Sequence, residues 1–422
     1  MNKLLFYAFI FSPFTSFGQV DSLLNKALES GNKRKFFEAR DFLQQEIKLH
    51  PGNAEAYYWL ARYAHYIVYD SRPFPGKGDQ WSKQEVLTNL RKAISLKPGF
   101  GDACYFLAVE YGARAREALR KKNVSQARKE LTEAKQAGAF PDYILQYAAL
   151  ILNACDHDAI LFVAGDGIYN AALYLQLVTG TRKDISLIAL GLLEQPYYVK
   201  MVRDGIKSII PSVPLRWNDD LIMESHTYVW MEQEIKIPLI PAVRTKYGLP
   251  GNQDTVSLSV PDWGGSLMNM SAVILNILEN NQWKRPVYCA LRKEERDLFI
   301  FSGYLQNQGF VSEMMPYEAA GTTHVYDEKK FSARVLNPEN YSSFSDIQMH
   351  DQPRADYFFA QDRRAQLLDF TAYLISNKQY QQARGILEKM DTLMPESILP
   401  LSEALKQQYE KLAEITAETG NQ

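Results

Sequence analysis

The sequence has few cysteines and histidines, and their positions argue against a structural metal site. Three cysteines and six histidines occur in 422 residues, with no CxxC or HxxxH spacing. A structural zinc site takes four such ligands at short spacings, so we expect no metal. Cys104, Cys155 and Cys289 each have apolar neighbours, which favours burial as small hydrophobic residues. A single disulfide between two of them is the alternative in an oxidising compartment.

Dense basic tracts and long apolar runs are also missing. The net charge is −2, and the densest basic stretch, Arg114–Lys122, is typical of a solvated helix face. Nucleic acid and anionic membrane surfaces are therefore not expected partners. Beyond the first eighteen residues, no stretch reaches the roughly 18 apolar residues that a spanning helix needs. At 46% hydrophobic and 23% charged residues, the composition is that of a globular protein.

The first eighteen residues predict a secretory signal peptide. A short basic start, Asn2-Lys3, precedes the apolar stretch Leu4–Phe11, and Ser16 and Gly18 place small residues before a cut at Gln19. No cysteine follows the cut, so a lipid anchor is not expected. These features predict that residues 1–18 are removed and that the protein is periplasmic or secreted, with no membrane span after their removal.

Residues 19–150 repeat an order of small, large and proline residues that is typical of the second helix of a tetratricopeptide repeat. The three copies are Ala39, Leu43 and Pro51; Leu90, Ala93 and Pro98; and Ala127, Leu131, Ala134 and Pro141. These prolines lie 47 and 43 residues apart (98 − 51 and 141 − 98), against about 34 in the standard repeat. Part of the excess falls in Asp70–Ser82, a segment rich in proline and glycine.

Such helical arms offer concave surfaces that bind peptides or partner proteins. We therefore predict a partner-binding groove that includes Tyr57, Tyr58 and Tyr111. The alternative is that the arm only packs against the next domain, because both roles use an apolar helix face. Residues 346–422 predict another helix pair, Asp362–Asn377 and Tyr380–Pro395, followed by a closing helix over Pro400–Glu418.

Residues 151–345 predict an α/β domain, because short β-branched runs alternate with helical stretches. The expected strands are Ala159–Ala164, Ile185–Leu190, Val256–Val260, Arg285–Leu291 and Phe310–Met315. The expected helices are Tyr169–Val178, Pro196–Asp204, Met268–Glu279 and a short one over Phe299–Gln308. The long connection Ser212–Gly251 is expected to be irregular. The fold class predicted is thus an α/β centre with a small, mostly parallel, Rossmann-like sheet, flanked by all-α tetratricopeptide-like repeats.

Ligands of such sheets collect at the carboxyl ends of the strands. Asp166 lies between Gly165 and Gly167 at the first such end, where the following helix presents free N–H groups. It could hold a ligand, or it could simply cap that helix. The ligand-binding residues predicted at this mouth are Asp166, Gly167, Asn170, Tyr197 and Tyr198.

Other candidates have plain alternatives. Glu194 follows the second strand and is either an acid/base partner of Asp166 or a surface charge. Trp263 is a sugar-stacking platform or a loop aromatic, and Arg292 binds an anion or is solvated. His157, between Asp156 and Asp158, is a metal ligand or part of a turn. Gly165-Asp166-Gly167 lacks the third glycine of a dinucleotide fingerprint, so no cofactor is expected.

Several longer stretches carry a resemblance to a known family. They are Gly165-Asp166, LYLQ at 173–176, TRKDISLIALGLLEQPYYV at 181–199, NQWKRPVYCA at 281–290, GYLQNQGFVSEMMP at 303–316 and YDEKKF at 326–331. In order and spacing, these resemble the soluble C-terminal region of bacterial protein O-mannosyltransferase-type membrane proteins, over roughly residues 150–400. The family pattern GDND is here Gly165-Asp166-Gly167-Ile168, so only its first Asp remains. The transferase chemistry of that family lies in a membrane-spanning half that this sequence lacks, so the resemblance implies an accessory domain.

We therefore expect an exported, non-enzymatic binding or scaffold protein that engages a protein or peptide in the cell envelope, with a glycan as a further candidate partner. It could serve protein glycosylation or envelope assembly. The alternative is a carbohydrate-active or other small-molecule enzyme that uses Asp166 and Glu194 across a crevice.

Overall fold

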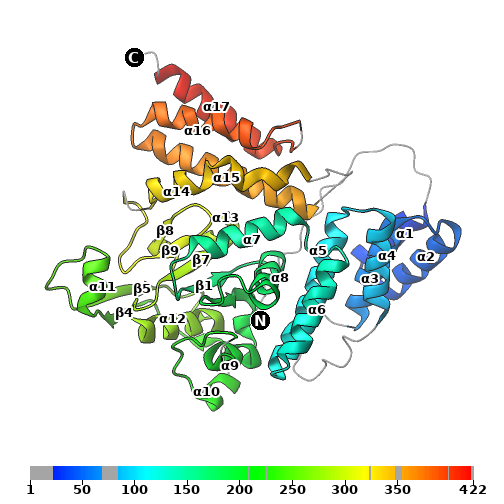
Figure 1. Cartoon of the computed structure of the whole chain (residues 1–422), viewed down its shortest axis with the longest axis horizontal. Coiled ribbons are helices and arrows are strands. Elements are labelled where there is room, and N and C mark those ends of the chain that lie inside the picture. Colours follow the sequence, from blue (N-terminus) through cyan, green and yellow to red (C-terminus); the bar gives the residue numbers. More distant parts are fainter. Residues whose placement is uncertain are drawn as a thin grey trace. The chain divides into compact units, whose positions relative to one another are not determined.

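The computed structural model describes residues 22–68, 84–207, 209–224, 226–322, 325–346, 354–397 and 399–419. The predicted signal peptide and the insertion Asp70–Ser82 lie outside these residues. The chain divides into two compact units, of which the first holds helices α1 to α4 and the second holds α5 to α17 with every described strand (Figure 1).

The first unit consists of paired helices whose small residues allow close packing. Its helices are α1 (Leu23–Asn32), α2 (Phe36–Leu49), α3 (Ala54–Val68) and α4 (Gln84–Leu96). Ala39, Leu43 and Ala93, three of the residues that carry the predicted repeat, are fully buried. A Cβ atom on Gly31 of α1 would lie 2.0 Å from the Tyr63 hydroxyl of α3, so a glycine is required there.

The predicted helical arm continues into the second unit. Its next helices are α5 (Gly101–Arg120), α6 (Val124–Gln136) and α7 (Asp142–Ala154). The unit boundary therefore falls after Leu96, inside the segment 19–150 that the sequence predicts as one arm. The C-terminal helices are α15 (Arg354–Ser376), α16 (Tyr380–Leu393) and α17 (Glu403–Thr419), which pack on one another.

A five-stranded sheet of order β2-β1-β7-β9-β8 forms the centre of the second unit. Its strands are β1 (Ile160–Val163), β2 (Ser186–Ala189), β7 (Val287–Ala290), β8 (Leu305–Asn307) and β9 (Ser312–Met314). Strands β2, β1 and β7 are parallel, with Val163 level with both Ala189 and Ala290. Strands β9 and β8 are antiparallel, so the sheet is mixed rather than mostly parallel.

Two predicted elements are wrong in type or in place. The stretch Phe299–Gln308 is not a helix but a 3₁₀ turn, η4 (Ser302–Tyr304), leading into β8. Val256–Val260 is a strand, β5 (Thr255–Val260), but it pairs with β4 (Gln233–Pro238) in a separate antiparallel ribbon. Its residues alternate between exposed and buried, as expected of a half-solvated antiparallel strand rather than a buried parallel one.

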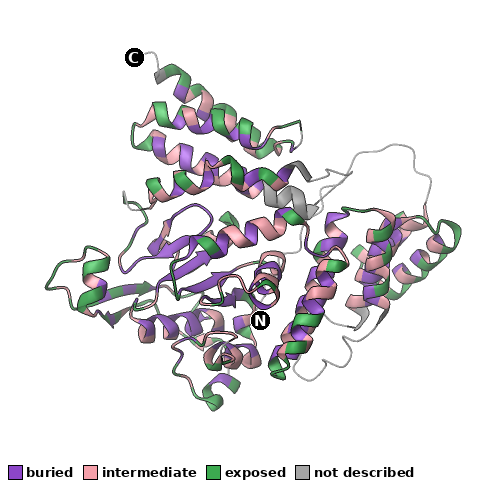
Figure 2. Cartoon of the chain, in the orientation of Figure 1, coloured by how far each residue is buried: buried purple, intermediate pink, exposed green. Residues whose placement is uncertain are grey.

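Helices cover both faces of the sheet, and all residues of β1, β2 and β7 are buried (Figure 2). In Figure 1, α7 lies on one side of the sheet and α12 (Asn269–Asn281) on the other. The shorter elements are α8 (Asp166–Tyr174), η2 (Leu175–Thr179), η3 (Leu190–Glu194), α9 (Pro196–Asp204), α10 (Asp219–Met223), β3 (Tyr228–Val229), α11 (Pro241–Lys246), β6 (Ser266–Leu267), α13 (Lys293–Asp297), α14 (Glu328–Val335) and η5 (Pro338–Asp346). In the part of the chain that the structure describes, no helix combines the length and the apolar character that crossing a membrane requires.

Candidate functional site

The strand order creates a switch point at the carboxyl edge of the sheet. The chain leaves β1 toward β2 on one side, whereas β7 lies on the other side of β1. The carboxyl ends of β1 and β7 therefore flank the position where ligands of open α/β sheets bind. Asp166 follows β1, Glu194 follows β2 and Arg292 follows β7, so all three come from this edge.

Asp166 is the first residue of α8 and is half-buried. The alternative prediction that it caps the helix is wrong, because Gly165 occupies the N-cap position. Gly165 has a φ of 85°, a left-handed conformation that favours glycine. A Cβ atom on Gly167 would lie 3.0 Å from the ring of Tyr105 in α5, so the helical arm packs against the start of α8.

Asn170 is fully buried, and its amide is bonded within the protein. Its Oδ1 accepts a hydrogen bond from Arg116 Nη1 at 2.7 Å, and its Nδ2 donates to the Ala108 carbonyl at 3.1 Å. A Cβ atom on Gly112 would lie 2.2 Å from Asn170 Oδ1. The amide that the sequence predicts as a ligand contact thus joins α8 to α5.

The two predicted tyrosines also face protein groups. Tyr198 is fully buried, accepts a hydrogen bond from the Ala189 amide at 2.8 Å and donates to the Tyr169 hydroxyl at 3.1 Å. Burial raises the pKa of Tyr198 well above its usual value, so it stays protonated. Burial also raises the pKa of Tyr197, and the charges that act on it come from Arg116, Glu117 and Arg120 of α5. Tyr198 therefore lies buried against β2 and α8, whereas Tyr197 stays partly exposed.

The Glu194 carboxylate accepts a hydrogen bond from the first turn of α12. Its Oε1 accepts a hydrogen bond from the Met270 amide at 2.9 Å, in the first turn of that helix. Beside it, Asn269 Nδ2 donates to the Leu193 carbonyl at 2.7 Å. Desolvation raises the pKa of Glu194, and the hydrogen bond from Met270 opposes this effect. The carboxylate satisfies an N–H group that would otherwise lack a partner in the helix.

Arg292 and Trp263 lie in two different turns. Arg292 is the N-cap residue of α13, and its guanidinium is bonded to Glu295 at 3.0 and 2.5 Å. Trp263 lies in the turn between β5 and β6, where the Gly265 amide donates to the Asp262 carboxylate at 2.7 Å. Trp263 is 48% exposed, so the alternative that it is tucked onto the core is wrong.

His157 lies in an exposed turn that leads into β1, with Asp158 in a left-handed conformation at φ 57°. Among the described residues, no group of three or more His, Cys, Asp or Glu side chains is placed to hold a metal ion. The three cysteines are buried and free, as the first of the two sequence interpretations predicts.

Of the predicted groove tyrosines, two are buried. Tyr111 has no exposed surface and Tyr58 is 4% exposed, so a partner cannot contact Tyr111 in this conformation. The Tyr58 hydroxyl instead accepts a hydrogen bond from Arg62 at 3.0 Å, and the Arg62 guanidinium lies 5.3 Å from the ring of Trp59. Tyr57 is partly exposed and is the one of the three that a partner can reach.

Two arginines that sequence reasoning missed hold the opposite, amino edge of the sheet. Arg285 donates to the Asp158 carbonyl at 2.8 Å, to the Ser212 carbonyl at 2.8 Å and to the Ser186 hydroxyl at 2.7 Å. It thereby joins the starts of β1, β2 and β7. Arg182 donates to three carbonyls at the end of α7 and pairs with Asp184 at 2.8 Å. Both arginines belong to stretches that carry the family resemblance, TRKD and KRP.

A third missed group surrounds a buried carboxylate on β9. Glu313 is 4% exposed and accepts hydrogen bonds from the Tyr247 hydroxyl at 2.9 Å and from Gln308 Nε2 at 2.7 Å. Lys246 Nζ lies 3.8 Å and Lys330 Nζ 4.0 Å from its two oxygens. Burial raises the pKa of Tyr247, and the Glu313 charge raises it further, so this phenol stays protonated and donates its hydrogen bond to Glu313.

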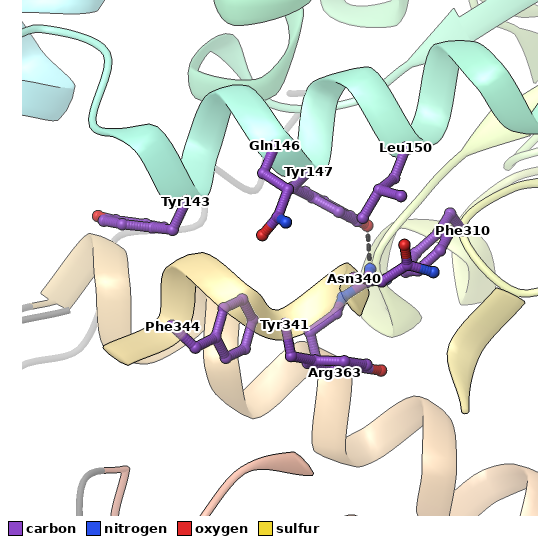
Figure 3. A pocket seen from close by; sticks show the side chains of 9 residues that line it. All are labelled: Tyr143, Gln146, Tyr147, Leu150, Phe310, Asn340, Tyr341, Phe344 and Arg363. Atoms are coloured by element: carbon purple, nitrogen blue, oxygen red, sulfur yellow. Dashed lines mark hydrogen bonds between the residues drawn. The ribbon is translucent and has the colours of Figure 1, made fainter. Parts of the chain in front are cut away.

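Side chains of α7, η5 and α15 pack around a small hollow (Figure 3). The Arg363 guanidinium lies 3.9 Å from the centre of the Tyr147 ring and 5.4 Å from that of Phe310. Arg363 also pairs with Asp362 at 3.0 Å, and burial raises the pKa of that carboxyl while Arg363 opposes the shift. The hollow has no room for a water molecule, so it is a packed contact and not a ligand site.

Comparison with known families gives one finding. A family model described as TMEM260-associated domain 2 matches residues 144–259 and 249–333. This stretch is similar to that domain. TMEM260 is related to protein O-mannosyltransferases, so the match agrees with a resemblance to O-mannosyltransferase-related proteins in general. No curated protein matches the chain. The matched stretch runs from α7 to α14 and includes the whole sheet, both arginines of its amino edge and Glu313.

Proposed function

We propose that this protein is a binding or scaffold protein of the cell envelope, whose tetratricopeptide-like arms hold a protein or peptide. In this proposal the sheet domain is an accessory module of an O-mannosyltransferase-related glycosylation system or of envelope assembly. The observation that supports it best is that most of the polar residues predicted to line a crevice form hydrogen bonds within the protein. Asn170, Glu194 and Tyr198 are bonded to neighbouring elements, and Arg292 is bonded to Glu295 of the helix that it caps.

In the first helical arm, the aromatic residues of α3 pack into the core, and Tyr57 beside them stays partly exposed. In α3, Trp59 and Tyr63 stack with ring centres 5.6 Å apart, and Arg62 lies beside them. This aromatic face leaves Tyr57 partly exposed in the first turn of the helix. Tyrosine is enriched at protein interfaces because it combines a large apolar ring with a polar hydroxyl. Export, a requirement of the proposal, is predicted from residues 1–18.

The experiment compares the full-length protein with two matched variants in capture and cross-linking from its native envelope fraction. Tyr57→Ala is expected to lose most of the specific partner, whereas Tyr380→Ala, a partly exposed tyrosine of α16, is expected to capture as much as wild type. Equal capture by both variants would contradict binding through the first arm. The melting temperatures of both variants are measured first, so that lost capture is not mistaken for unfolding.

A carbohydrate-active site at the carboxyl edge is the second candidate. It is favoured by the placement of Asp166 and Glu194, which follow the neighbouring strands β1 and β2 at one edge of the sheet. A thermal-shift screen of sugars, nucleotides and divalent metals tests it, because a ligand of the folded state raises the melting temperature. A sugar that stabilises wild type but neither Asp166→Asn nor Glu194→Gln would support the enzyme and count against the scaffold.

A further inference from the structure

The β4–β5 ribbon has one closed edge and one open edge. At the outer edge of β5, the Ser259 amide donates to the Tyr304 hydroxyl at 2.7 Å, and that hydroxyl donates to the Ser257 carbonyl at 3.4 Å. Tyr304 therefore occupies the groups with which a further strand would pair. On the other side, no strand of the described residues pairs with the outer edge of β4.

The register shows which groups the open edge of β4 presents. In an antiparallel pair, residues alternate between those that bond to the partner strand and those whose N–H and C=O point away from it. Ser257 and Ser259 point away from β4, so the residues opposite them, Lys236 and Glu234, point away from β5. The bond from the Leu239 amide to the Asp254 carbonyl fits the same alternation. Glu234 and Lys236 have exposed side chains, and Pro238, the third residue that points away from β5, has no N–H to donate.

We propose that two copies of this chain associate through the outer edges of their β4 strands, antiparallel about a two-fold axis at Ile235. In this register Glu234 lies opposite the partner's Lys236, and Lys236 lies opposite the partner's Glu234. Each of these pairs exchanges two backbone hydrogen bonds. The ribbons then form one four-stranded sheet, β5-β4-β4-β5.

Charge complementarity selects this occupant and this register. A lysine on an edge strand ordinarily opposes pairing, because the next strand would bury or repel it. Here each exposed lysine meets a glutamate directly across the strands, and such a pair is stabilising. Moving the axis to Glu234 or to Lys236 places two like charges opposite each other. An unrelated strand would have to bring this alternation by chance, whereas a second copy always brings it.

Two exposed apolar residues precede β4 in the chain. Met231, two residues before β4, is 80% exposed, and Val229 is 95% exposed. The pairing brings Met231 to the far end of the partner's β4, near its Leu239. Six strand residues on each side are fewer than the roughly 20–30 of a standard interface. The dimer is therefore expected to be reversible and to depend on concentration.

The test measures the mass of the full-length protein by sedimentation equilibrium over a range of concentrations. Wild type is expected to shift from monomer to dimer as concentration rises. Lys236→Glu and Glu234→Lys each place like charges opposite each other at both pairs, so each is expected to weaken the dimer about tenfold to hundredfold. The double variant Glu234→Lys/Lys236→Glu exchanges the two charges and is expected to restore it.

Two controls separate this interface from other causes. Lys406→Glu makes the same charge reversal on the exposed surface of α17 and is expected to leave the dimer unchanged. Tyr57→Ala is also expected to leave it unchanged, so that failure of the proposed arm function does not affect this test. A wild type that remains monomeric throughout, or a double variant no better than its single parents, would overturn the proposal.

Discussion

The contact between α5 and α8 gives the sharpest test of the fold. In an open helix, Gly→Ala stabilises by about 1 kcal/mol, because alanine is the better helix former. At Gly112 the added Cβ would lie 2.2, 2.3 and 2.5 Å from Asn170 Oδ1, Cγ and Nδ2. Asn170 is buried and held by Arg116 and Ala108, so it cannot swing away without losing both hydrogen bonds. We expect Gly112→Ala to destabilise the protein by about 1–3 kcal/mol despite its gain in helix propensity.

A double-mutant cycle separates this clash from other effects. Asn170→Ala alone removes two buried hydrogen bonds and is expected to cost about 2–3 kcal/mol. It also vacates the space that the new methyl group would enter, so Gly112→Ala/Asn170→Ala should be more stable than the sum of the single losses, by about 1–2 kcal/mol. Gly385→Ala in α16, where a Cβ meets nothing within 4 Å, is the matched control and should stabilise. The midpoints of denaturant unfolding measure all four variants. Additive losses, or a Gly112→Ala variant as stable as Gly385→Ala, would refute the reasoning.

Three further predictions concern buried or paired groups. Glu313→Ala leaves the Tyr247 hydroxyl and the Gln308 amide without their acceptor and is expected to cost about 2–5 kcal/mol in chemical denaturation. The exposed Glu414→Ala should change little. A small loss at Glu313 would show that water replaces the carboxylate. The hydrogen bonds from Arg182 lower the pKa of Asp184 to about 2 from its usual 3.8, so this group stabilises the fold above about pH 4 and the contribution is lost as the pH falls toward 2. The free energy of unfolding of Asp184→Asn is therefore expected to be about 1 kcal/mol lower than that of wild type at pH 7, after allowance for solvent screening. This difference should shrink in unfolding curves measured below pH 4. A difference that does not change with pH would contradict the assignment. Burial raises the pKa of Cys155 and Cys289, and all three thiols are buried. A thiol reagent should therefore label none of them rapidly in the native protein and all three after denaturation. Fast labelling of the native protein would argue for an open conformation.

The spacing of apolar residues predicted those helices and strands that are long enough to show a pattern in their own sequence. The paired helices at both ends, the three parallel strands and α12 follow from the spacing of apolar and small residues, and the structure contains them. The strand predicted over Phe310–Met315 contains β9, but β8 and the antiparallel pairing did not follow, because both strands have only three residues. A strand that short has no periodicity of its own, and its pairing depends on distant partners.

The candidate site was predicted less well, for a physical reason. Strand ends do bring Asp166, Glu194 and Arg292 to one edge, as parallel strand order requires. Sequence could not show that α5 would pack against α8 and α9, because that contact depends on a space left by Gly112. Nor could it show that Glu194 would bond to the amide of Met270, 76 residues away. In both cases, a polar side chain that looked available is used by a distant helix.

Arg285 has a consequence for how relatives of this domain are interpreted. One guanidinium binds the beginnings of three strands, and it lies in one of the stretches that carry the family resemblance. A likeness in that stretch therefore reports how the amino edge of the sheet is held together and gives no information on what the carboxyl edge binds.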